Sequence, residues 1–114
     1  MNGQANGVTT EKGERCVLVR LTGEVDLSWS PAVRRAVLEA LGQDLPVGVD
    51  LSRVDYIDSS GIAALVEGLQ GARERGGRFV LVAVSDAVRA VLELARLDRV
   101  FTLVDGADAV PAAA

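Results

Sequence analysis

The chain has 114 residues, 49% of them hydrophobic, which is enough apolar material for one compact domain and too little for two. Its formal net charge of −4 argues against direct binding to nucleic acid or to an anionic membrane surface, because both need a basic patch. No signal peptide is visible and no apolar run is long enough to span a bilayer, so we expect a cytoplasmic protein without membrane insertion whose partner is another protein.

The first quarter of the chain predicts a tail and a hairpin. Residues 1–7 are polar and contain glycine, which is typical of a flexible N-terminal tail. Residues 8–10 predict a short edge strand, and 11–14 predict the turn that leads into a second strand over 15–21. Cys16, the single cysteine, falls in that strand and is expected to be buried there.

A helix and a third strand follow. The strand pattern breaks at 22–27, and Ser30 followed by Pro31 predicts a helix with a capping hydroxyl and proline in its first turn. Gly42 is expected to end this helix. Residues 47–51 alternate in the way that predicts a strand with at least one covered face.

The second half of the chain repeats this alternation of helices and strands. A helix is predicted from Ser59 to about Arg75, with an apolar stripe made by Ile62, Leu65, Val66 and Leu69. Residues 78–84 predict a strand covered on both faces, Ser85 and Asp86 predict the cap of a further helix, and 100–104 predict a last short strand. Residues after 104 have only weak helical potential.

This order of elements predicts the fold class. Strand–helix–strand connections favour parallel pairing with right-handed crossovers. We therefore expect an α/β domain with a mixed, mostly parallel sheet of four to five strands and helices packed over it, spanning residues 8–106. Residues 107–114 are expected to be a helix end or a tail.

Asp58, Ser59 and Ser60 lie where a strand ends and a helix begins. Asp58 is placed to cap the helix, which leaves both serines in its first turn, where free N–H groups and the helix dipole favour an anion. One interpretation is a capped helix with two solvated hydroxyls. The other is reversible phosphorylation, because a phosphoserine at a helix N-terminus is stabilised there and adds dense negative charge beside Asp58.

Two residues upstream are further candidates. Asp26 lies in the loop after the second predicted strand and would face the same partner as Ser59 if the two loops converge. A local turn or cap is the competing interpretation for Asp26. Trp29, the only tryptophan, is either a partner anchor or a residue packed under the following helix.

The residues that are missing exclude most catalytic machinery. The chain contains no histidine, so a Ser-His-Asp hydrolase is excluded, and its single lysine, Lys12, falls in a predicted turn. No phosphate-binding glycine loop is present. Asp50, Asp55 and Asp58 lack a calcium-loop pattern and are typical turn and cap residues after strands. We expect no enzymatic activity, no cofactor and no metal site.

Several blocks of the sequence, taken together and in this order, resemble the STAS domain of bacterial anti-sigma-factor antagonists. The resemblance covers residues from about 8 to 104. The blocks are the segments 18–26, 49–51, 58–61, 82–88 and 97–101. The third block, Asp58-Ser59-Ser60-Gly61, carries the motif.

The resemblance implies a mechanism of partner switching. Family members bind an anti-sigma factor that is also a serine kinase, and the kinase phosphorylates the first serine of the motif until a serine phosphatase restores it. By position, Ser59 would be the phosphoacceptor rather than Ser60, Asp58 the carboxylate that orients the loop, and Gly61 the residue that permits close approach. Asp26 matches an acidic residue at the family's partner interface. The kinase supplies ATP and magnesium.

A second resemblance names a different partner. The segments 50–54 and 89–101 are also similar to the STAS subunit of bacterial lipid-asymmetry ABC transporters, which implies a structural and regulatory partnership with an ABC permease. The intact pair of Ser59 and Ser60 favours the phosphorylatable antagonist.

Overall fold

A computed structural model describes residues 6–112. Its elements are β1 (Gly7–Lys12), β2 (Val17–Val25), α1 (Ser30–Leu41), β3 (Val47–Ile57), α2 (Ser59–Glu74), β4 (Phe79–Val82), α3 (Asp86–Leu94), β5 (Thr102–Val104) and a 3-10 turn at Ala107–Ala109. The strands form one sheet in the order β1-β2-β3-β4-β5, in which β1 is antiparallel to β2 and the other neighbours are parallel. The predicted mixed, mostly parallel α/β fold is confirmed.

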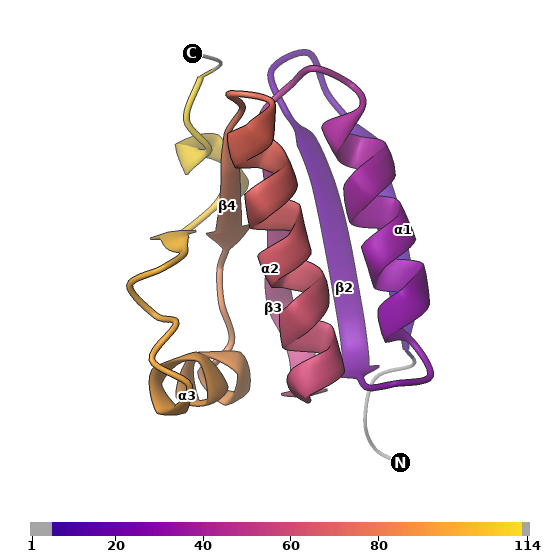
Figure 1. Cartoon of the computed structure of the whole chain (residues 1–114), viewed down its shortest axis with the longest axis vertical. Coiled ribbons are helices and arrows are strands. Elements are labelled where there is room, and N and C mark those ends of the chain that lie inside the picture. Colours follow the sequence, from indigo (N-terminus) through magenta and orange to yellow (C-terminus); the bar gives the residue numbers. More distant parts are fainter. Residues whose placement is uncertain (1–5, 113–114) are drawn as a thin grey trace.

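Helices α1 and α2 lie side by side over one face of the sheet (Figure 1). The main core lies between these helices and the sheet, and Leu21, Leu51, Leu65 and Leu81 are among its fully buried side chains. β4 is buried along its whole length, as predicted for a strand covered on both faces. None of the helices in residues 6–112 is long and apolar enough to cross a membrane.

Strand β2 is longer than its sequence pattern predicts. The prediction that the strand breaks at residue 22 is wrong, because 22–25 continue the pairing with β3 through to Val25 opposite Ile57. Register shifts between Arg20 and Thr22 and between Gly23 and Glu24 absorb the irregular pattern as bulges. Gly23 has φ of 82°, which glycine adopts at little cost.

Strand β3 also runs beyond its predicted end at residue 51, to Ile57. Its first half pairs with β4 only as far as Asp50, so the second half has a free edge on that side. α3 packs against this edge, and the Ser85 hydroxyl donates to the Val54 carbonyl oxygen at 2.8 Å. Ser85 also accepts from the N–H of Val88, which confirms it as the cap of α3. The long β3 carries the loop before α2 beyond the end of β4, to the level at which β2 ends.

Three local predictions are corrected. Ser30 does not cap α1: it is the first helical residue, and its N–H and that of Trp29 both donate to the carbonyl oxygen of Asp26, at 2.8 and 2.9 Å. Cys16 is half-buried and precedes β2, beside a small apolar cluster on the other face of the sheet. The hairpin turn comes later than expected, since residues 11 and 12 belong to β1 and the Gly13 N–H donates to the Cys16 carbonyl.

The ends of the domain differ slightly from the predicted boundaries. Residues 1–5 of the expected tail lie outside the described residues, but the Asn6 side chain accepts from the N–H of Glu24 at 2.8 Å and Gly7 begins β1. At the other end, the strand expected at 100–104 begins at Thr102, and Val110 is buried against the small cluster on the outer face. Residues 113–114 also lie outside the described part.

Candidate functional site

Asp58 holds the start of α2, as the sequence predicts. It has extended backbone angles, and its Oδ1 accepts from the N–H groups of Ser60 and Gly61 at 2.9 and 3.2 Å. The Ser60 hydroxyl donates to the same oxygen at 2.6 Å. The carboxylate therefore satisfies two N–H groups that would have no partner inside the helix.

These hydrogen bonds lower the pKa of Asp58 below its ordinary value. The largest cause is the hydroxyl of Ser60, and the N–H groups of Gly61, Ser60 and Leu27 act in the same direction. Partial burial opposes the shift but does not reverse it. Because Leu27 belongs to the loop before α1, this loop lies close enough to the start of α2 to influence the Asp58 carboxylate.

Replacing Asp58 with alanine is expected to lower the free energy of unfolding by about 1 kcal/mol at neutral pH, since the cap is lost. The folded-state pKa of Asp58 lies below the ordinary value of 3.8, so the contribution of the carboxylate is present above pH 3.8 and is lost as the pH falls through the folded-state pKa. Urea unfolding of wild type and Asp58→Ala between neutral and strongly acidic pH measures both effects.

The control for this prediction is Asp55→Ala, which removes an exposed carboxylate that makes no hydrogen bond or ion pair within the described residues. A stability difference between wild type and Asp58→Ala that stays constant through the acidic range would contradict the proposed role of the ionised cap.

The two serines of the motif differ in their surroundings. Ser59 is the first residue of α2 and is exposed, whereas Ser60 is half-buried and its hydroxyl is engaged by Asp58. The first helical turn therefore presents one hydroxyl to solvent beside a carboxylate and keeps the second inside the cap.

The loop that contains Asp26 does converge with the start of α2. The N–H of Asp58 donates to the carbonyl oxygen of Val25 at 3.2 Å, so the ends of β2 and β3 are joined at this point. Asp26 Oδ1 accepts from the N–H of Ser28 at 2.9 Å, which is the local turn considered as its competing interpretation. Asp26 is therefore both a turn residue and a close neighbour of the motif along the paired strand ends.

Gly61 lies buried beneath the motif. A Cβ at this position would lie 2.7 Å from Ile57 Cγ1, 2.8 Å from Val25 Cγ1 and 3.0 Å from the Val25 carbonyl oxygen. Contacts this short would push α2 away from the strand ends. The close approach that Gly61 permits in this structure is thus between the helix and its own sheet.

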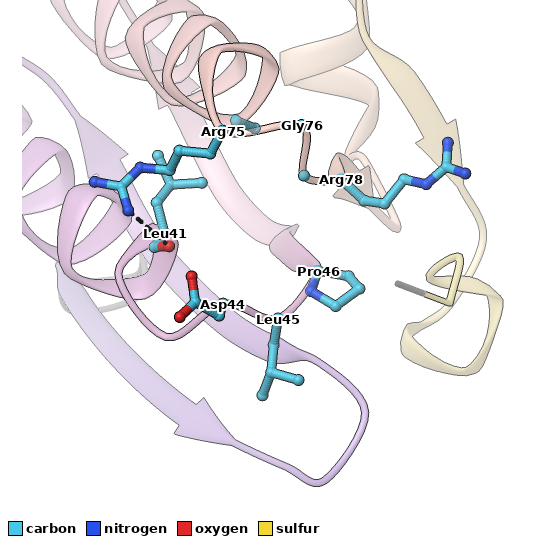
Figure 2. A pocket seen from close by; sticks show the side chains of 9 residues that line it. Leu41, Asp44, Leu45, Pro46, Arg75, Gly76 and Arg78 are labelled. Atoms are coloured by element: carbon cyan, nitrogen blue, oxygen red, sulfur yellow. Dashed lines mark hydrogen bonds between the residues drawn. The ribbon is translucent and has the colours of Figure 1, made fainter. Parts of the chain in front are cut away.

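Two hollows border the helices. A groove of about 630 Å³ runs between α1 and α2 from Ser60, and Arg34 Nε donates across the helix pair to Glu67 Oε2 at 2.8 Å. A smaller pocket of about 160 Å³ lies at the opposite end, where both helices finish (Figure 2). There Arg75 bonds to the Leu41 carbonyl oxygen at 3.4 Å while Arg78 points away, so the two guanidinium groups do not converge on a common ligand.

The other residues considered in the sequence have local partners. Asp50 accepts from the N–H and hydroxyl of Ser52 at 2.9 and 2.7 Å and lies 3.6 Å from the Arg20 guanidinium. Within residues 6–112, no group of three carboxylate or cysteine side chains is gathered in a way that would hold a metal ion. Trp29 is half-buried at the start of α1.

Sequence reasoning missed two residues beside the motif. Leu27 and Tyr56 are large apolar side chains that remain exposed, on the loop after β2 and near the end of β3. The strand pattern alone does not predict that either side chain is exposed. Their positions close to Asp26 and Asp58 in the sequence are the signal that could have identified them.

Comparisons with known proteins agree with this architecture. The family model described as "Mlab, STAS domain" matches residues 8–105. The anti-sigma-B factor antagonist of Listeria monocytogenes is 26% identical over 84 residues, which are 73% of this chain and 74% of that protein.

Solved structures give the same picture. An anti-sigma factor antagonist from Mycobacterium paratuberculosis is 26% identical with a TM-score of 0.79, covering 91% of this chain and 89% of that one. The phosphorylated form of the Bacillus cell fate determinant SpoIIAA has 22% identity and a TM-score of 0.67, with coverages of 85% and 90%.

One further neighbour comes from a different functional class. A sulfate transporter family protein from Wolinella succinogenes shares the fold at 22% identity, with a TM-score of 0.67 and coverages of 80% and 77%. The family model matches the chain from β1 through β5, and this match holds whichever of the two functional classes the chain has. The chain belongs to the STAS domain family.

Proposed function

We propose that this protein is an anti-sigma-factor antagonist that binds a cognate anti-sigma factor with serine kinase activity and is released when Ser59 is phosphorylated. The observation that carries the proposal is the exposed hydroxyl of Ser59 at the first position of α2, directly after the Asp58 cap. The similarity to the anti-sigma-B factor antagonist of Listeria monocytogenes supports the same class of partner.

The geometry is suited to a switch that leaves the fold intact. A phosphate on Ser59 would lie at the N-terminus of a 16-residue helix, where the helix dipole stabilises an anion, while Asp58 keeps the N–H groups of Ser60 and Gly61. Ser60 is a poorer acceptor in this proposal, because its hydroxyl already donates to Asp58. A phosphatase that removes the phosphate would restore the binding form.

In this proposal the chain is a binding protein and a substrate, not an enzyme. It has no histidine and one lysine, so the phosphoryl transfer chemistry, with ATP and magnesium, belongs to the kinase. Sigma factors act on transcription, so the working compartment is the cytoplasm.

The proposal is tested by incubating the protein with purified serine-kinase anti-sigma factors of its source organism, ATP and magnesium. We expect a stable complex before phosphorylation and a mass increase of one phosphoryl group that peptide mapping assigns to Ser59. Ser59→Ala should bind the kinase and gain no phosphate. Modification confined to Ser60, or no complex with any of these kinases, would overturn the proposal.

The STAS subunit of a lipid-asymmetry ABC transporter is the second candidate, because the segments 50–54 and 89–101 resemble it and the fold also occurs in a transporter family protein from Wolinella succinogenes. In that case affinity purification from the source organism would recover an ABC permease and its ATPase in place of an anti-sigma factor. Ser59→Asp gives a further distinction, because only the antagonist is expected to lose its partner through this change.

A further inference from the structure

Two large apolar side chains stand in solvent next to the motif. Leu27 is 74% exposed and Tyr56 is 50% exposed, although each belongs to a segment whose neighbouring residues, Val25 and Ile57, are buried. An exposed tyrosine is typical of residues that anchor a protein partner, and the exposed leucine adds apolar area at the same end of the sheet.

Both side chains lie at the same end of the sheet. Tyr56 pairs with Glu24 across β2 and β3, and one residue further Ile57 pairs with Val25. Leu27 follows two residues after Val25, and its N–H contributes to lowering the pKa of Asp58. Glu24, Leu27, Asp55 and Tyr56 therefore surround the strand ends, and we call these four residues the strand-end patch.

The surroundings of the patch are predominantly acidic. Glu24, Asp26, Asp55 and Asp58 all lie in the segments 23–28 and 53–61, in which Arg53 is the only basic residue. None of these carboxylates takes part in an ion pair within residues 6–112. The end of the sheet thus carries two exposed apolar side chains among carboxylates that form no ion pair within the described residues, and we call these four carboxylates the acidic rim.

We propose that the strand-end patch docks a basic surface of the anti-sigma factor, with Leu27 and Tyr56 inserted into an apolar depression that arginine or lysine side chains surround. The proposal rests on the proposed function and adds the chemistry of the partner. A second copy of this chain fits the patch poorly, because a two-fold contact would set carboxylates opposite carboxylates.

Two of the carboxylates, Glu24 and Asp55, lie on the strands and not at the start of α2. A kinase that phosphorylates Ser59 must bring its nucleotide phosphates to that hydroxyl, and in this proposal Glu24 and Asp55 meet the protein surface around the nucleotide. Basic residues in the partner therefore attract the rim, and the nucleotide repels a phosphate on Ser59.

The test measures binding of the purified anti-sigma factor by calorimetry to wild type, Leu27→Ser, Tyr56→Thr and Leu94→Ser. Leu94 is a matched control, because it is 87% exposed but lies on α3. We expect Leu27→Ser and Tyr56→Thr each to weaken binding by about tenfold or more and Leu94→Ser to leave it unchanged. Asp55→Asn should reduce the association rate and its dependence on salt.

Circular dichroism and thermal unfolding check that all variants fold. If wild type binds and the Leu27 and Tyr56 variants bind equally well, or if Leu94→Ser weakens binding as much as they do, the patch is not the anchor and the proposed function stands without it. If wild type binds no serine-kinase anti-sigma factor, the proposed function fails and the inference fails with it. Self-association of wild type that Leu27→Ser abolishes would show that the patch binds a second copy.

Discussion

Ser59→Asp is expected to weaken binding to the anti-sigma factor on the order of 100-fold, whereas Ser59→Ala should bind like wild type. A like charge brought against a partner's charge costs several kcal/mol when the interface excludes water, and roughly 2.7 kcal/mol corresponds to a factor of 100. In the proposed switch the partner's charge is the phosphate group of its bound nucleotide. Calorimetric titration of the nucleotide-bound anti-sigma factor with the two variants measures the difference.

The control for the charge itself is Gln70→Glu, which adds one negative charge on an exposed position of the same helix, away from the motif. This variant should bind as wild type does. All three variants should unfold within about 0.5 kcal/mol of wild type, because each changes an exposed side chain. Equal affinities for Ser59→Asp and Ser59→Ala would show that a single charge at this hydroxyl does not operate the switch.

The parts of the site that the sequence predicts correctly depend on local chemistry. Asp58 follows a strand and precedes an apolar helical stripe, and the requirement of a helix for an N-terminal hydrogen-bond acceptor is enough to place it. The same reasoning fails for Ser30, because the carbonyl oxygen of Asp26 takes the N–H of Ser30 and makes it the first helical residue. Residue propensities do not distinguish a capping serine from a first helical serine here, because the competing acceptor, the Asp26 carbonyl oxygen, is placed by the folded loop.

The lengths of β2 and β3 could not be predicted for a different reason. Polar residues such as Arg53 and Asp55 interrupt the apolar alternation of β3. In a strand that is covered on both faces, such polar residues would mark the end of the strand. In the structure they are exposed on a strand that has lost its β4 neighbour, so they meet solvent and not the core. The ends of these strands depend on where the neighbouring strands end, and the exposure of Tyr56 follows from that. Both are set by the tertiary fold and cannot be read from the local sequence pattern.

The α2 stripe shows the same limit inside the core. Leu65 and Val66 both fit the helical spacing of the apolar face, and the sequence gives no reason to rank them. In the structure Leu65 is fully buried, while Val66 is only partly buried and packs at the margin of the core. Helix geometry explains the difference, because consecutive residues point about 100° apart around the axis and only one of these two can point to the centre of the core.

Leu65→Asp is therefore expected to unfold the domain at 25 °C. An unpaired carboxylate in an apolar site costs several kcal/mol, and the lost leucine packing adds about 2 to 5 kcal/mol, against a total stability of about 5 to 15 kcal/mol for a domain of this kind. Circular dichroism and urea titration should show no cooperative transition for this variant. Leu65→Ala, which leaves no buried charge, should retain a transition at lower urea concentration.

Val66→Asp is the matched comparison, since it places the same carboxylate one residue along the same helix. Because Val66 reaches solvent in part, its carboxylate can stay hydrated, and this variant should lose less stability than Leu65→Asp and keep a cooperative transition. If both aspartate variants unfolded to the same extent, the helix would be buried more evenly than the structure has it.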